Sequence, residues 1–207
     1  MLLFAHTGIT AGCAWLASKT VSILDRGEPE PAKASAEEQS SGQDTSRKIG
    51  KPFHLTGIDY RMLLIGSMLP DIIDKPLGIY LLADEIGNGR IFAHTLLFLL
   101  ILIAAGLLLY YYRRNTAVLL LGAGTFAHLA LDQMWQNPQT LFWPLFGVVF
   151  EQHDTGEWLP GILETLTSNP ATYIPEIIGA LIVAVFGWHI IRHGNLATFF
   201  RTGRIDK

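Results

Sequence analysis

Five apolar stretches separated by polar segments dominate this sequence. They cover residues 4–24, 58–73, 91–112, 116–134 and 173–191. None alternates between apolar and polar positions as a half-buried strand would. The clearest, 91–112, has about 22 residues, enough for a helix to cross a bilayer, whereas 58–73 is short for a span. The pattern predicts an all-α fold, a polytopic membrane helix bundle of about five spans.

Two segments between these stretches have a different composition. Residues 25–52 are rich in Glu, Ser, Lys and Pro and have almost nothing to bury, so we expect a mobile loop. Residues 135–172 contain no Lys or Arg but carry several acids and three Trp residues, which is typical of a segment lying at the membrane interface. We treat residues 1–207 as a single domain.

The overall composition supports a membrane protein. Hydrophobic residues make up 50% of the chain and charged residues only 16%. The formal net charge of -3 argues against a general nucleic-acid binder. No basic residues precede the 4–24 stretch as they would in a signal peptide, so we expect a retained first helix. The single cysteine excludes a thiolate cluster, so a metal site would need His and carboxylate ligands.

The basic residues predict an orientation. If the turn at 113–114 is cytoplasmic, the 25–57 loop and the basic C-terminal tail lie on the same side. Thirteen of the 15 Lys and Arg residues are then cytoplasmic, and only Lys75 and Arg90 lie outside. We therefore expect an integral protein of a bacterial or archaeal cytoplasmic membrane, with the N-terminus and the 135–172 segment extracytoplasmic.

This orientation places three His and three Asp residues at the outer ends of four stretches. Within that set, His128 and Asp132 are four residues apart, so they share one face of a helix. The complete set is His6, Asp71, Asp74, His94, His128 and Asp132. Such a group suits Zn²⁺ or another divalent metal, as one or two ions. The alternative is a hydrogen-bonded polar layer without a metal. In the same orientation His54, His189 and His193 fall on the cytoplasmic side.

The motifs around these residues resemble the YdjM family of membrane-bound predicted metal-dependent hydrolases. They are Phe4-Ala-His6-Thr-Gly8, Leu69-Pro70-Asp71-Ile-Ile-Asp74, Arg90-Ile-Phe-Ala-His94-Thr-Leu and Ala127-His128-Leu-Ala-Leu-Asp132. That family is similar to the zinc-dependent phospholipase C and P1 nuclease group, all-α enzymes whose metals activate water against a phosphoester. The phospholipases carry a later His-x-x-x-Glu pair that this chain lacks, and His153 and Asp154 do not have its spacing. The resemblance therefore implies one or two metals.

Together, the grouped His and Asp residues and the family resemblance suggest a membrane-bound metal-dependent hydrolase. It would act on a phosphoester, such as a phospholipid or a lipid-linked phosphate, through metal-activated water. The expected metal ligands are His6, Asp71, His94, His128 and Asp132. The expected catalytic residues are Asp71, as ligand or general base, and Asp74, bridging or orienting. The lipid bilayer and the phosphoester are the expected partners. A metal or ion carrier and a non-catalytic scaffold with a structural metal remain the alternatives.

Overall fold

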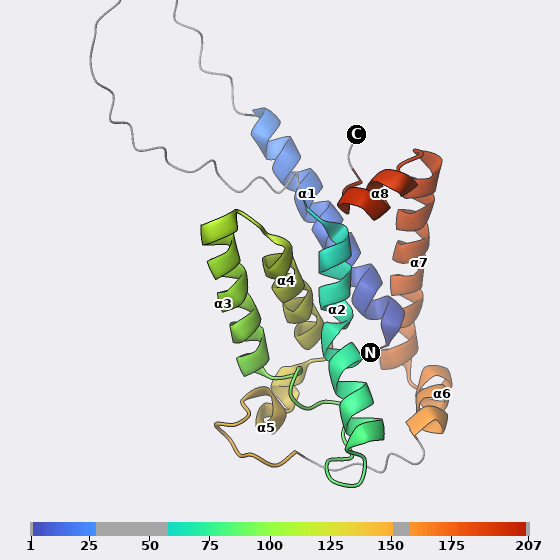
Figure 1. Ribbon diagram of the computed structural model, residues 1–207. Helices are drawn as coiled ribbons and strands as arrows, with labels where there is room; N and C mark the ends of the chain where they lie inside the picture. The colour runs from blue at the N-terminus through green and yellow to red at the C-terminus, as the bar shows by residue number, and fades with distance from the viewer. Residues whose placement is uncertain (1, 28–57, 151–157, 206–207) are drawn as a thin grey trace, which may run out of the picture.

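The computed structural model describes residues 2–27, 58–150 and 158–205, and within these ranges the chain forms helices and turns without a strand (Figure 1). The eight α-helices of the described ranges are α1 (Thr10–Gly27), α2 (Tyr60–Lys75), α3 (Leu96–Arg113), α4 (Ala117–Leu131), α5 (Pro138–Leu141), α6 (Trp158–Ser168), α7 (Pro170–Arg192) and α8 (Leu196–Thr202). Shorter turns precede α1, follow α2 and follow α4: η1 (Ala5–Ile9), η3 (Pro76–Leu81) and η4 (Met134–Gln136). The all-α prediction is confirmed for these residues.

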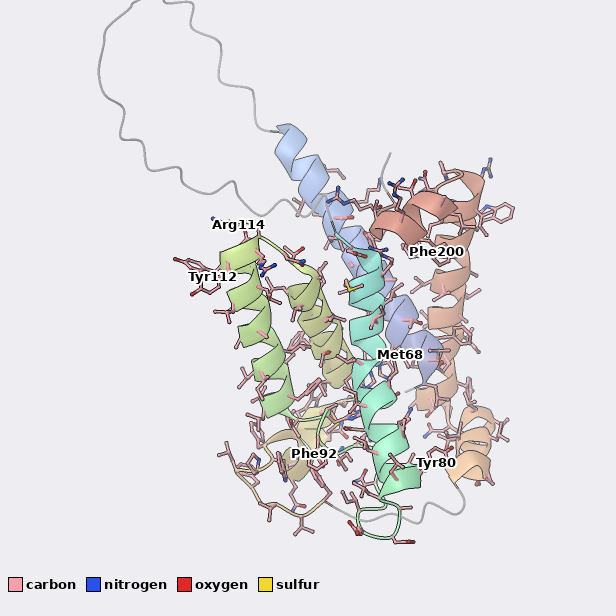
Figure 2. All side chains as sticks on the ribbon, viewed as in Figure 1. Met68, Tyr80, Phe92, Tyr112, Arg114 and Phe200 are labelled. Atoms are coloured by element: carbon pink, nitrogen blue, oxygen red, sulfur yellow. The ribbon has the colours of Figure 1, made fainter. Side chains whose placement is uncertain are left out.

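Two described helices, α3 and α7, are long and apolar enough to cross a membrane. They have 18 and 23 residues with mean hydropathies of 2.1 and 2.0, and only 11% and 17% of their apolar windows are buried. The core helix of a soluble protein would be mostly buried. Instead these side chains face outward, as Tyr112 does at the end of α3 (Figure 2). Helix α4 is also apolar but shorter. The arrangement of five spans stays a prediction.

The helical segment that carries Asp71 and Asp74 continues beyond the end we expected. The apolar pattern placed both carboxylates at the end of a short span. In the structure α2 has 16 residues and η3 adds 6 more, so both lie inside a longer helical segment. Pro76 does not stop the helix, because its φ of -61° and ψ of -40° keep the right-handed helical conformation from α2 into η3.

The next helix begins later than we expected. The apolar run starts at Ile91, but α3 starts at Leu96, after Thr95. The Thr95 hydroxyl accepts a hydrogen bond from the N–H of Phe98 at 3.0 Å, which caps the helix. His94 therefore lies in a non-helical segment before α3, and not on the helix as the pattern indicated.

Glycines allow α2 and α4 to touch along their backbones. A Cβ atom added to Gly66 would lie 2.3 Å from the carbonyl oxygen of Leu121, and one added to Gly124 would lie 2.3 Å from that of Leu63. Small residues at such positions permit close helix packing where no hydrophobic effect drives association. The contact places the middle of α4 against the first half of α2.

A second glycine contact joins the N-terminal turn η1 to α7. A Cβ atom on Gly8 would lie 2.2 Å from the carbonyl oxygen of Gly179, and one on Gly179 would lie 2.0 Å from that of Phe4. In Figure 1 the N-terminus lies between α2 and α7, at the level where α4 ends. The turn η1 also contacts α2 and α4, so these three elements meet in one part of the bundle.

Several sequence predictions fall on residues that the structure does not describe. Of the predicted loop at 25–52, residues 25–27 end α1 and the remainder lies outside the described residues. His54, His153 and Asp154 also lie outside them.

The glycine contact between α2 and α4 predicts a selective effect of adding one methyl group. We expect Gly124→Ala to lower the free energy of unfolding by about 1–3 kcal/mol, because the new Cβ meets backbone atoms that cannot rotate away. Gly187→Ala on α7 is the matched control, since nothing lies within 4 Å of its added Cβ. Thermal unfolding in detergent would show the difference, and equal melting temperatures for the two variants would contradict it.

Candidate metal centre

All six of the sequence-predicted site residues lie in one buried cluster. Two groups within it offer ligand atoms that lie within 4.8 Å of one another, and both groups include His128. One group is His6, His128 and Asp132, and the other is Asp71, His94 and His128. The three imidazole side chains and Asp74 are fully buried. The cluster therefore combines residues from η1, α2, α4 and the segment before α3.

The position of His128 depends on a proline inside α2. Pro70 has no N–H to donate to the carbonyl of Gly66, four residues earlier. The hydroxyl of Thr125 donates to that carbonyl instead, at 3.2 Å. On the next turn of α4, Nδ1 of His128 lies 2.7 Å from the carbonyl oxygen of Ser67. A carbonyl only accepts, so Nδ1 carries the proton and Nε2 of the neutral ring has a free lone pair.

The position of His94 depends on Asp74. The carboxylate of Asp74 accepts hydrogen bonds from the N–H groups of Ile91 at 2.9 Å, Ala93 at 2.9 Å and His94 at 3.1 Å. It also lies 2.7 Å from Nδ1 of His94. Both carboxylate oxygens are thus engaged, which favours the orienting role for Asp74 over direct bridging. Nδ1 of His94 donates to this carboxylate, leaving a lone pair on Nε2.

The two free imidazole nitrogens face each other. Nε2 of His128 lies 3.2 Å from Nε2 of His94. Two lone pairs at this distance repel unless a metal ion or a proton lies between them. Two His nitrogens bound to one tetrahedral Zn²⁺, each about 2.0–2.1 Å from the metal, would be about 3.3 Å apart. Oδ1 of Asp71 lies 3.6 Å from Nε2 of His94 and 3.8 Å from that of His128. These three atoms fit a shared metal ion.

His6 and Asp132 form the other side of the cluster. The ring of His6 stacks on the ring of His128 with centroids 3.9 Å apart. Its Nε2 lies 3.2 Å from Oδ1 of Asp132, yet neither ring nitrogen makes a hydrogen bond of good geometry within the described residues. A fully buried imidazole without hydrogen bonds is costly. Either a metal ion or a proton shared between His6 and Asp132 would satisfy it.

Two cations contact the carboxylates of this cluster. Nζ of Lys75 lies 2.7 Å from Oδ2 of Asp71, and Nη2 of Arg90 lies 2.8 Å from Oδ2 of Asp132. Each carboxylate therefore has one oxygen toward the histidines and the other toward a cation. Sequence reasoning placed both cations on the outer side without connecting them to the site.

Glu176 on α7 supports the cluster and was missed in the sequence. Its carboxylate is 8% exposed and accepts hydrogen bonds from the backbone N–H groups of Leu2 at 2.5 Å, Phe4 at 2.9 Å and Ala5 at 3.3 Å. These bonds satisfy N–H groups at the start of η1 and hold the turn that carries His6. A single acid inside an apolar span was the signal that could have identified it.

The remaining described histidines are far from the cluster. His189 lies on α7, 13 residues after Glu176 and about 20 Å further along the helix at 1.5 Å per residue. His193 follows the end of α7. Neither belongs to a group that could hold a metal among the described residues.

Helices with outward apolar surfaces, together with a buried group of His and Asp residues, define a helical membrane protein with a candidate metal centre. The family described as YdjM inner membrane protein matches residues 1–196, and the chain belongs to this family. The matched range contains all six cluster residues. No curated protein and no solved structure matches the chain.

The contacts of Glu176 predict that its charge stabilises the N-terminal turn. We expect Glu176→Gln to lower the free energy of unfolding by about 1–3 kcal/mol, because hydrogen bonds to a carboxylate are stronger than those to an amide. Thermal unfolding in detergent would measure this effect. The control is Glu164→Gln, at an exposed position on α6, which should leave the melting temperature unchanged. A Glu176→Gln variant with the melting temperature of the wild type would contradict this anchoring role.

Proposed function

We propose that this protein is a membrane-bound metal-dependent hydrolase acting on a phosphoester, such as a phospholipid or a lipid-linked phosphate. The observation that supports it best is the facing pair of Nε2 atoms of His94 and His128, 3.2 Å apart. Each ring is held by an acceptor on its Nδ1, so both lone pairs are directed toward the same space. This arrangement of an oriented imidazole and its supporting acceptor is usual for metal-binding histidines.

One divalent ion fits the cluster more simply than two. His128 belongs to both candidate groups but has a single free nitrogen, because its Nδ1 donates to Ser67. An ion bound by His94, His128 and Asp71 would leave only His6 and Asp132 from this cluster for a second. Imidazole and carboxylate ligands without a thiolate suit Zn²⁺.

Asp71 and Asp74 would have different roles beside the metal. A divalent ion held here would act as a Lewis acid and lower the pKa of a bound water toward neutrality. Asp71 presents Oδ1 to the histidines while Lys75 holds Oδ2, so Asp71 is placed to be a ligand or a general base through that one oxygen. Asp74 orients His94 and keeps its proton on Nδ1.

Apolar surface near the cluster supports a substrate that arrives from the lipid. Phe92, two residues before His94, packs edge-on against Trp143 and Phe150 with ring centroids 5.4 Å and 5.3 Å apart (Figure 2 labels Phe92). The chain between those two aromatics exposes Leu145 by 83% and Val149 by 80%. Side chains of this kind suit the boundary between headgroups and acyl chains. We place the site at the extracytoplasmic face because of the charge bias.

The first test is metal content. We expect the purified full chain to contain close to one Zn²⁺ or similar ion per molecule, measured by mass spectrometry of the metals. His94→Ala and His128→Ala should each lose most of it, because each removes a free nitrogen from the facing pair. His189→Ala and His193→Ala serve as matched controls and should retain it. Metal retained in both cluster variants would exclude these residues as ligands.

The second test is hydrolysis. We expect the zinc-loaded protein to hydrolyse bis(p-nitrophenyl) phosphate or a phospholipid in mixed micelles, to lose that activity with a chelator, and to recover it with Zn²⁺. His128→Ala should lower the rate by at least about 100-fold, as expected for loss of a metal ligand. A protein that binds stoichiometric metal but hydrolyses none of these substrates would have a structural metal, and the hydrolase proposal would be wrong.

A further inference from the structure

The two exceptions to the charge bias of this chain meet at the same place. Of the 15 Lys and Arg residues, the predicted orientation leaves only Lys75 and Arg90 on the outer side. In the structure both contact carboxylates of the metal cluster, Lys75 that of Asp71 and Arg90 that of Asp132. They approach from separate segments, Lys75 from the end of α2 and Arg90 from the connection before α3.

Both cationic side chains are partly exposed. The side chains of Lys75 and Arg90 are 28% and 43% exposed, whereas Asp71 and Asp132 are 7% and 3% exposed. The Arg90 contact with Asp132 uses Nη2, and a guanidinium has five N–H donors. Arg90 can therefore remain on Asp132 while it donates to a second oxyanion. The ammonium of Lys75, with three donors, has the same capacity.

The backbone around Arg90 is fixed on both sides. Its own N–H donates to Oδ1 of Asn88 at 2.8 Å, and the N–H of Ile91 donates to Asp74 at 2.9 Å. The carboxylate that orients His94 thus also fixes the chain that carries Arg90. A guanidinium on a fixed backbone next to a metal site is well placed to position a planar or tetrahedral oxyanion.

The charges of the cluster make such binding depend on the metal. Asp71, Asp74 and Asp132 carry three negative charges against the two positive charges of Lys75 and Arg90. With neutral histidines the cluster alone is therefore negative by one charge and does not favour an anion. One divalent ion makes it positive by one charge, which favours an anion beside the metal.

We infer that Lys75 and Arg90 form an anion-binding pair that holds the phosphate group of the substrate next to the metal. This inference rests on the proposed function and deepens it, since it identifies which residues recognise the substrate. Their partial exposure leaves N–H donors accessible to a ligand that approaches the metal. The shared chemistry is a phosphate oxyanion, supplied either by a lipid headgroup or by a soluble phosphate compound.

The test measures inorganic phosphate binding to the zinc-loaded full chain in phosphate-free maltoside detergent micelles by calorimetry. We expect Lys75→Gln and Arg90→Gln each to weaken phosphate binding at least tenfold, while zinc content stays at the wild-type level. Lys19→Gln and Arg113→Gln are the matched controls, because both positions are exposed and belong to the cytoplasmic set. They should bind phosphate like the wild type. Lys75→Arg and Arg90→Lys, which keep the charge, should retain most of the affinity.

A second arm separates the two sources of phosphate. The titration is repeated in maltoside detergent micelles, which contain no phosphate, with and without added phosphatidic acid. Competition by phosphatidic acid that disappears in Arg90→Gln supports the pair and assigns it to a lipid headgroup. Phosphate binding that depends on the pair but is indifferent to phosphatidic acid supports the pair and assigns it to a soluble phosphate.

Two results would overturn the inference. The first is unchanged phosphate affinity per bound zinc in Lys75→Gln and Arg90→Gln. The second is loss of zinc in these variants while the zinc-containing fraction binds phosphate as tightly as the wild type. That result would mean that the two cations serve only the carboxylates. Failure of the proposed function gives different results, either a wild-type protein that binds metal but hydrolyses no phosphoester or a wild-type protein without metal. Phosphate binding by that metal-free protein would then support the pair if the two variants weakened it, and would exclude the pair if they did not.

Discussion

The buried carboxylate of Asp74 is the constraint on which the rest of the site depends. Inside an apolar bundle an unpaired backbone N–H is costly, so non-helical chain is tolerated only where other groups satisfy it. Asp74 accepts from the N–H groups of Ile91, Ala93 and His94, and so permits the chain to enter α3 through an irregular turn. That turn carries His94 into the cluster, and the same carboxylate fixes its proton. A helix beginning at Ile91 would leave these N–H groups directed along its axis and His94 elsewhere.

The contact between α2 and α4 supplies the other half of the site by similar means. Glycines at 66 and 124 bring the two backbones together, and Pro70 releases the carbonyl of Gly66 to receive the hydroxyl of Thr125. The carbonyl that Pro70 leaves without a helical hydrogen bond thus joins α2 to α4. His128 follows on the next turn and is oriented by Ser67. Both free imidazole nitrogens are therefore positioned by groups on α2, which explains why one helix with two carboxylates and a proline lies at the centre of the cluster.

The sequence predicted the all-α fold and the grouping of the six His and Asp residues, because apolar run lengths and the distribution of Lys and Arg are local or additive properties. It did not predict where α3 begins, since an apolar run does not reveal that its first N–H groups are bound by a carboxylate 17 to 20 residues earlier. The partner of Glu176 was hidden for the same reason, at a separation of more than 170 residues. The contacts of Lys75 and Arg90 also required the fold, because only packing shows that these two cations reach the same cluster.

The anchoring of the N-terminal turn by α7 has a consequence for how the protein is made. His6 is the first residue of the cluster to leave the ribosome, but the acid that holds its turn belongs to the last long helix. The other cluster residues, through Asp132, are synthesised before α7 exists. During biosynthesis all six cluster residues are therefore present before their geometry is complete, which requires α7 to be made and to pack against η1 through Gly8 and Gly179. Packing of α7 thus acts as the closing step of assembly of the site, and a chain that stops short of α7 carries every ligand without a finished site.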